Sequence, residues 1–137
     1  EVIAPSELLL SGTESDTDNA SVVLRVSLGE VSFLLAADIF REGEASIMRG
    51  GLNVDADVLK VPHHGSRNSS TQAFLAAVSP TAAVISAGAD NQFGHPHREA
   101  LDRLARHVPP GRVYLTSEHG TVTFVTDGET LTVTTER

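Results

Sequence analysis

Two adjacent histidines are the residues of this chain best suited to chemistry. They stand in the segment Pro62-His63-His64-Gly65-Ser66, directly after the apolar run Val58 to Val61. Asp38 follows an earlier apolar run, and His95 and His97 follow a later one. Ligands of open α/β sheets bind beyond the carboxyl ends of the strands. We therefore expect these side chains to meet at one edge of a sheet, where imidazole and carboxylate groups can bind a metal or transfer protons.

The adjacency of His63 and His64 has two interpretations. Neighbouring side chains of an extended segment point in opposite directions, so one imidazole can face a metal while the other faces a substrate or an orienting partner. Alternatively, one histidine belongs to the core and the other to the surface. A short turn at a strand end has little structural need for two histidines, so we favour the functional pair.

Asp38 also has two interpretations. As a residue at the end of a strand, it can cap the helix expected from Arg41. As a carboxylate, it can ligate a hard or borderline divalent metal.

His95 and His97 flank Pro96, which favours an extended conformation for His95. One of the two imidazoles can orient or protonate a phosphate oxygen. The alternative for His97 is an ordinary residue of the first turn of the next helix. His107 and His119 lack such a context, and we expect them at the surface.

Composition narrows the class of protein. The chain has 137 residues, enough for one domain with a core, and a formal net charge of −8. Its ten Lys and Arg residues are not clustered, and five Phe with one Tyr are too few for an extended base-stacking platform. Metal ions or another region must therefore supply positive charge if the chain handles nucleic acid. The absence of cysteine excludes thiolate metal sites and thiol nucleophiles.

Hydrophobic periodicity predicts an α/β fold, a mixed sheet with helices on one face and no cover on the other. Residues 1–19 are expected to be irregular. Helices are expected at Arg41 to Arg49, at Thr71 to Val78 (capped by Ser69 or Ser70) and at His97 to His107. Strands are expected at Ser21 to Ser27, Val31 to Ala37, Asp57 to Val61, Ala82 to Ser86, Arg112 to Thr116, Thr121 to Thr126 and Leu131 to Thr135.

Several motifs together carry a family resemblance. They are Asp18-Asn19-Ala20-Ser21, the run Phe33 to Asp38, the segment Asp57 to Ser66 with Leu-Lys-Val-Pro-His-His-Gly-Ser, the run Ala83 to Gly88, and Phe93-Gly94-His95-Pro96-His97. In this order they resemble the C-terminal part of the metallo-β-lactamase-like domain of ComEC-type DNA-internalisation competence proteins. The resemblance covers nearly the whole chain.

The resemblance implies that residues 1–137 form a single unit, the C-terminal half of an αβ/βα sandwich. It implies two divalent ions, zinc or manganese, in the complete domain, and weak or absent metal binding by this fragment. Asp38 matches the bridging aspartate, which usually follows a glycine, and His63 matches a late histidine ligand, with the choice between His63 and His64 open. The implied roles are metal ligands Asp38 and His63, catalytic residues His64 and His95, and substrate-binding residues Asn19, Ser21, Ser66 and His97.

The His-x-His-x-Asp-His signature of the superfamily does not occur in this sequence. We expect it to lie N-terminal to Glu1 in a longer protein, so the fragment alone should be inactive. The expected function is part of a metal-dependent phosphodiesterase or nuclease of a membrane DNA-uptake protein in natural transformation. The alternatives are a non-catalytic accessory module of the uptake channel and a small-molecule metallohydrolase.

The same resemblance implies the partners and the location. The expected partners are DNA, the N-terminal half of the same domain and the membrane channel region of the parent protein. The isolated chain is expected either to self-associate through the uncovered sheet face or to be marginally stable. The parent is expected in the cytoplasmic membrane, with this fragment as a soluble domain on an undetermined side.

Overall fold

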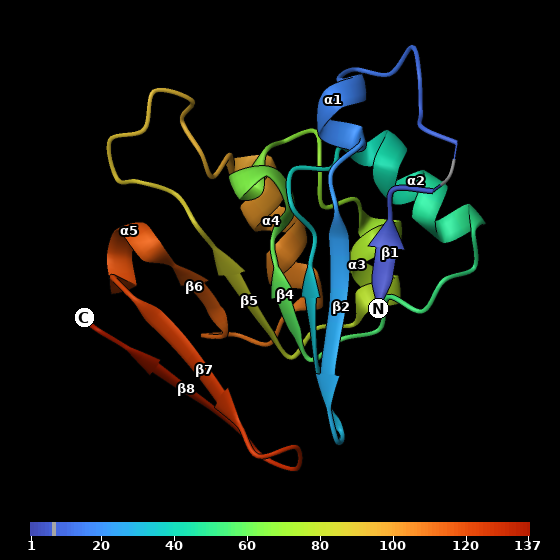
Figure 1. Ribbon diagram of the computed structural model, residues 1–137. Coiled ribbons are helices and arrows are strands. Elements are labelled where there is room, and N and C mark those ends of the chain that lie inside the picture. The colour runs from blue at the N-terminus through green and yellow to red at the C-terminus, as the bar shows by residue number, and fades with distance from the viewer. Residues whose placement is uncertain (7) are drawn as a thin grey trace.

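A six-stranded mixed sheet forms the centre of the computed structural model, which describes residues 1–6 and 8–137 (Figure 1). The strands lie in their chain order, β1-β2-β3-β4-β5-β6. Their bounds are β1 Val2–Ala4, β2 Val23–Leu28, β3 Val31–Leu35, β4 Val58–Lys60, β5 Ala82–Ile85 and β6 Val113–Leu115. The helices are α1 Asp16–Asn19, α2 Arg41–Arg49, α3 Gln72–Val78, α4 Arg98–His107 and α5 Thr116–His119.

The strand directions bring the carboxyl ends of β3, β4 and β5 to one edge of the sheet. Strand β2 is antiparallel to both β1 and β3, whereas β3, β4, β5 and β6 are parallel. Each parallel connection passes through one of the helices α2, α3 and α4. Parallel strands need such crossovers because the end of one strand and the start of the next lie at opposite edges of the sheet. The loops after β3, β4 and β5 therefore lie together, at the top in Figure 1.

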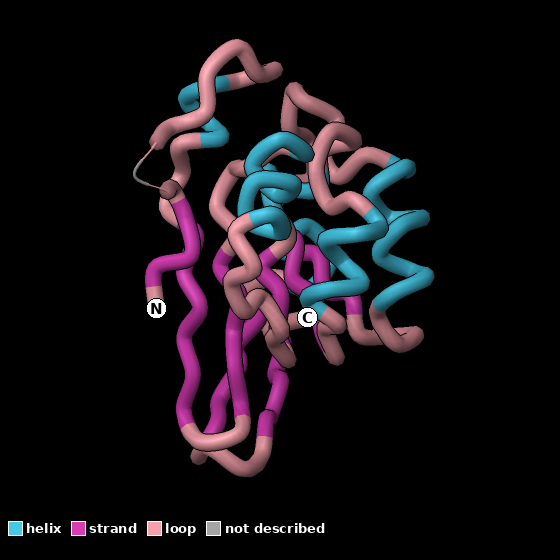
Figure 2. The backbone as a smooth tube through the Cα atoms, turned by 90° about the vertical axis from the view of Figure 1, so that its right-hand side faces the viewer, coloured by secondary structure: helices cyan, strands magenta, loops and turns pink. Residues whose placement is uncertain are grey.

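Helices α2, α3 and α4 pack on one face of the sheet, as Figure 2 shows from the side. Leu34, Leu59 and Ala83 point into this layer and are fully buried. They share one core cluster with Phe74 and Leu75 of α3. The predicted mixed sheet with helices is confirmed. The expected cap of α3 is wrong, however, because Thr71 accepts the hydrogen bond from Phe74 N.

The last two strands form a separate hairpin instead of extending the sheet. Strands β7 (Val122–Thr126) and β8 (Leu131–Thr135) pair only with each other, and α5 redirects the chain before them. The hairpin reaches the open face, where the Phe124 ring packs edge-on against Phe33 at 6.2 Å and Tyr114 at 5.9 Å. Its turn touches the β2–β3 turn, with Glu30 N donating to Gly128 O at 2.7 Å. The hairpin thus covers part of the face without helices.

Part of that face is apolar and exposed. Val26 lies opposite Phe33 in the β2–β3 ladder, and Leu24 lies opposite Leu35. Residues opposite each other in an antiparallel ladder share a face. Val26 is 50% exposed, Leu28 55% and Leu35 40%. These side chains lie on the same face of the sheet as Phe33, but the hairpin does not cover them.

The N-terminal segment differs from the prediction of an irregular stretch. Strand β1 pairs with β2, and the four-residue helix α1 begins after Ser15, whose side chain accepts from Asp18 N. Such short elements carry too little hydrophobic periodicity to be recognised from sequence. Across residues 1–6 and 8–137, no helix is both long enough and apolar enough to cross a membrane.

Candidate functional site

The two histidines sit in a tight turn with unusual backbone geometry. His63 has φ 48° and ψ 45°, and His64 has φ 53° and ψ 23°, so both are left-handed. Ala37, before Asp38, also has a positive φ of 47°, and its carbonyl accepts from His63 N at 3.0 Å. A left-handed conformation suits glycine better than alanine. Non-glycine residues in this region cost about 1 to 3 kcal/mol each and gather at functional sites.

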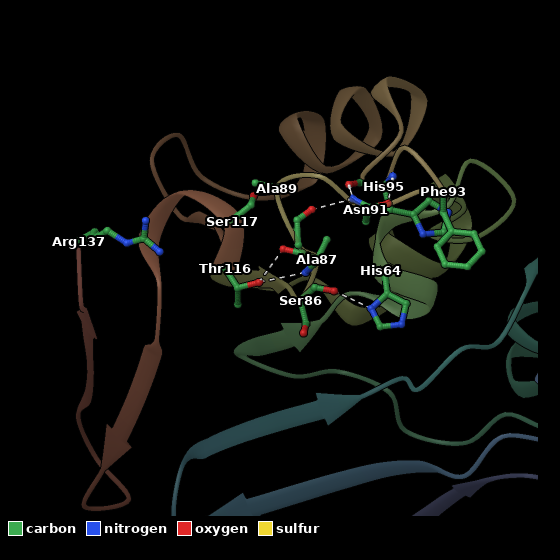
Figure 3. A pocket seen from close by; sticks show the side chains of 11 residues that line it. His64, Ser86, Ala87, Ala89, Asn91, Phe93, His95, Thr116, Ser117 and Arg137 are labelled. Atoms are coloured by element: carbon green, nitrogen blue, oxygen red, sulfur yellow. Dashed lines mark hydrogen bonds between the residues drawn. The ribbon is translucent and has the colours of Figure 1, made fainter.

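His64 faces Asp38 with its free nitrogen. Its Nδ1 lies 2.6 Å from the carbonyl oxygen of Ser86, which can only accept, so Nδ1 carries the proton (Figure 3). In the neutral ring, Nε2 then has a lone pair. The Nε2 atom lies 3.6 Å from Oδ1 of Asp38. This separation is too long for a hydrogen bond but suits two ligands of one ion. A carbonyl on the second nitrogen is a common way to orient a metal-binding histidine.

His63 lies beside the same group. Its ring packs edge-on against Phe40 with centroids 4.5 Å apart, and its centroid is 5.6 Å from that of His95. Its Nδ1 is buried and has no hydrogen-bond partner within the described part of the chain. Buried polar atoms of native proteins are normally hydrogen-bonded, so this nitrogen is available to a ligand or a proton partner.

His95 and His97 complete the histidine group. Their ring centroids are 4.8 Å apart, and His95 lies 6.3 Å from His64. The Nδ1 atom of His97 accepts from Arg67 N at 3.1 Å, which leaves Nε2–H as a donor in the neutral ring. Burial lowers the pKa of His95 below its ordinary 6.5, and the neighbouring histidines lower it further.

A close approach of two backbone segments holds His97 near the turn. His97 N donates to Gly65 O at 2.9 Å. Gly65 has φ +80°, and a Cβ atom there would lie 2.6 Å from Cβ of Pro96. Only glycine fits this position without displacing the segment that carries His95 and His97.

The remaining predicted residues are placed differently. Asn19 is only 4% exposed, and its Oδ1 accepts from Phe40 N at 2.9 Å and Gly43 N at 3.0 Å. Asn19 therefore caps α2, although it is distant in sequence. The alternative that Asp38 caps this helix is wrong, because no side chain at the N-terminus of α2 makes a capping hydrogen bond. Ser66 is buried, and its Oγ accepts from Asn68 N. Ser21 is half-buried and lies two residues before β2.

Glu44 and Arg103 bind the backbone of Ser69 to Thr71, the segment after the histidines, and neither was predicted from the sequence. The carboxylate of Glu44 is fully buried in α2 and accepts from Ser70 N and Thr71 N. Burial raises its pKa above the ordinary 4.5, against these hydrogen bonds. Arg103 donates to the carbonyls of Ser70 at 2.8 Å and Ser69 at 2.9 Å. A signal existed in the sequence, because Glu44 lies on the buried stripe of its helix with Gly43 and Ile47.

Lys60 places a cation close to the site. It is half-buried, and its Nζ donates to Val61 O at 3.0 Å. Burial lowers the pKa of this ammonium group, while the charge of Asp38 acts in the opposite direction. The carboxylate of Asp38 therefore has both Lys60 and His64 in its surroundings.

A cavity of about 670 Å³ opens beside His64 and His95. Its lining includes Ser86, Phe93 and Arg137 (Figure 3). Phe93 and Arg137 were not predicted as site residues, since an exposed aromatic or a lone arginine carries no spacing signal. The cavity is of a size that holds small molecules in other proteins.

The donor groups agree with a borderline divalent metal only in part. Asp38 and His64 supply a carboxylate oxygen and an imidazole nitrogen, which suit zinc or manganese. Among residues 1–6 and 8–137, no three His, Cys, Asp or Glu side chains are grouped closely enough to hold an ion. A stable site usually needs three or four protein ligands. Asp38 and His64 alone are therefore too few to hold such an ion stably.

Comparison with known proteins relates the chain to much longer proteins. It is 41% identical over 107 residues to ComE operon protein 3 of Bacillus subtilis, 38% over 108 residues to Competence protein ComA of Neisseria gonorrhoeae, and 33% over 107 residues to Recombination protein 2 of Haemophilus influenzae. Each match covers 78% of this chain but only 14%, 15% and 13% of the respective relative. No family model and no solved structure matches the chain.

Proposed function

We propose that this chain provides the Asp38–His64 edge of a metal-dependent phosphodiesterase site that acts on DNA in a competence protein. The observation that carries the proposal is the geometry of His64. Its Nδ1 is fixed by Ser86 O, and its Nε2 lies 3.6 Å from Asp38 beside three further histidines. The similarity to a relative named for competence supports the biological setting.

Each residue of the edge has a proposed role. Asp38 and His64 are the metal ligands that the geometry favours. The ring of His63, whose buried Nδ1 has no hydrogen-bond partner among the described residues, lies beside His95. The Nε2–H of His97 is available to a phosphate oxygen because Nδ1 is occupied by Arg67 N. His95, between His63 and His97, is placed to transfer a proton. When bound, divalent ions would neutralise phosphate charge and acidify the attacking water.

The positive charge of the ions would also offset the net charge of −8, which otherwise repels a polyanion. We assign the missing ligands to the N-terminal half of a sandwich that packs on the open sheet face. The exposed row of Val26, Leu28 and Leu35 supports such a partner, since large exposed apolar patches mark interaction surfaces. We also propose that the parent protein lies in the cytoplasmic membrane and that this chain lies next to its channel region.

The proposal predicts where a metal first binds to this chain. In a titration with substoichiometric Mn²⁺, the imidazole proton signals of His63, His64 and His95 should broaden before those of His107 and His119. The reason is that paramagnetic Mn²⁺ held near Asp38 relaxes nearby protons most strongly. The measurement is a histidine-resolved NMR titration of the purified chain.

The matched control is Asp38→Asn, which keeps the shape of the side chain but removes its charge. This variant should need at least fivefold more Mn²⁺ for the same broadening. Equal broadening of all six histidines, or an unchanged titration in Asp38→Asn, would exclude this edge as the metal site.

A further inference from the structure

Three rings next to the cavity form a nearly parallel row. The ring of His95 lies 19° from the plane of His64 with centroids 6.3 Å apart, and 23° from the plane of Phe93 with centroids 5.8 Å apart. These values fall within the range of offset-stacked aromatic pairs. Phe93 is the outer member of the row and is 66% exposed. One face of its ring is therefore available to another flat ring.

The loop that carries Phe93 is held firmly. Asn91 Nδ2 donates to Gly88 O at 2.8 Å and to His95 O at 2.6 Å, while its Oδ1 accepts from His95 N at 2.9 Å. On the other wall of the cavity, Ala87 N donates to Oγ1 of Thr116 at 3.0 Å. Phe93 thus belongs to a loop that is held by internal hydrogen bonds, and its ring is exposed in this hydrogen-bonded conformation.

The cavity joins this ring to the proposed phosphodiester site. Phe93, His64 and His95 line the same space, together with the hydroxyl of Ser117 and the cation of Arg137 (Figure 3). A nucleotide presents a flat base and a charged phosphate only one sugar apart. The exposed ring suits the base, and the histidines and the arginine suit the phosphate.

We infer that Phe93 is the stacking platform for one unpaired nucleobase of the nucleic acid held at the histidine edge. The inference rests on the proposed function and names its substrate as a single-stranded end or segment. A base inside a duplex is already stacked and paired, and its removal costs several kcal/mol. A single ring also agrees with the aromatic content of the chain, which is too low for an extended platform.

The test uses two fluorescein-labelled probes with the same phosphates, pentathymidylate and its fully abasic analogue, in millimolar Mn²⁺. Phe93→Ala should weaken pentathymidylate binding about 5- to 150-fold in fluorescence anisotropy, because stacking of a base contributes about 1 to 3 kcal/mol. Binding of the abasic probe should change by less than about twofold. Phe93→Trp should retain pentathymidylate binding.

Val125→Ala is the matched control, since Val125 is an apolar residue of similar exposure on β7, outside the cavity. It should leave both probes unaffected. A similar loss for both probes in Phe93→Ala, or no loss for either, would overturn the stacking inference while leaving the metal site in place. If neither probe binds the wild-type chain although Mn²⁺ broadens the histidines, this chain does not hold a nucleobase by itself and the stacking inference fails, whereas the proposed function is decided by cleavage in the joined protein.

Discussion

Replacement of Glu44 by alanine should lower the free energy of unfolding by about 2 to 6 kcal/mol. The carboxylate is fully buried and accepts hydrogen bonds from Ser70 N and Thr71 N. Each buried N–H left without an acceptor costs about 1 to 3 kcal/mol. This is a large share of the stability of an ordinary domain, about 5 to 15 kcal/mol. Urea unfolding followed by circular dichroism measures the loss.

Glu42→Ala is the matched control on the same helix. Glu42 is half-buried, and its only side-chain hydrogen bond in the described structure is a long one of 3.5 Å from Asn19 Nδ2. We expect this variant to lose less than about 1 kcal/mol. Equal losses in Glu42→Ala and Glu44→Ala would show that Glu44 does not hold the segment after the histidines.

Glu44→Gln keeps the size of the side chain and tests the pKa if Glu44→Ala does not fold. Because burial raises the folded-state pKa of Glu44, its proton is bound more tightly in the folded than in the unfolded chain. The resulting stabilisation is fully present below the unfolded-state pKa of about 4.3 and is lost as pH rises through the folded-state pKa. The stability of the wild type relative to Glu44→Gln should therefore decline with rising pH. An advantage that grows with pH would contradict the burial effect.

Much of the fold could be predicted from local patterns. The helix Arg41–Arg49 and the β2–β3 hairpin follow from periodicity and turn residues. The meeting of Asp38, His64 and His95 follows from a general property of parallel strands, whose carboxyl ends share an edge. These features depend on residues close together in the chain or on strand direction alone.

The features that escaped prediction depend on contacts between distant segments. Asn19 caps a helix that begins more than twenty residues later, and Glu44 binds backbone groups of Ser70 and Thr71. The separation of the β7–β8 hairpin from the sheet depends on α5 and on the contact between Glu30 and Gly128. No spacing rule within a single segment reveals such partners, because loop conformation decides them.

The second large effect concerns the chemistry of the edge. In a protein that joins this chain to the proposed N-terminal half, Asp38→Asn and His64→Ala should each lower the rate of DNA cleavage at least about 100-fold. Asp38 and His64 face each other at 3.6 Å, so removal of either leaves the site without one of its two donors from this chain. Loss of a ligand removes the charge stabilisation that the ion would supply, which is worth several kcal/mol, and each 1.36 kcal/mol corresponds to a factor of about ten in rate. His107→Ala, on the last turn of α4, should keep the wild-type rate.

The metal site shared between this chain and the N-terminal half is tested most directly by cleavage of a 5′-labelled single-stranded oligonucleotide in Mn²⁺. The isolated chain and the joined protein are compared. We expect little or no cleavage by the chain alone, because its described residues bring only two donors together. The joined protein should cleave the oligonucleotide in a metal-dependent way, and Asp38→Asn and His64→Ala should each abolish this cleavage. Robust cleavage by the chain alone that disappears in Asp38→Ala would contradict the shared site, and cleavage by the joined protein that survives both substitutions would contradict the function.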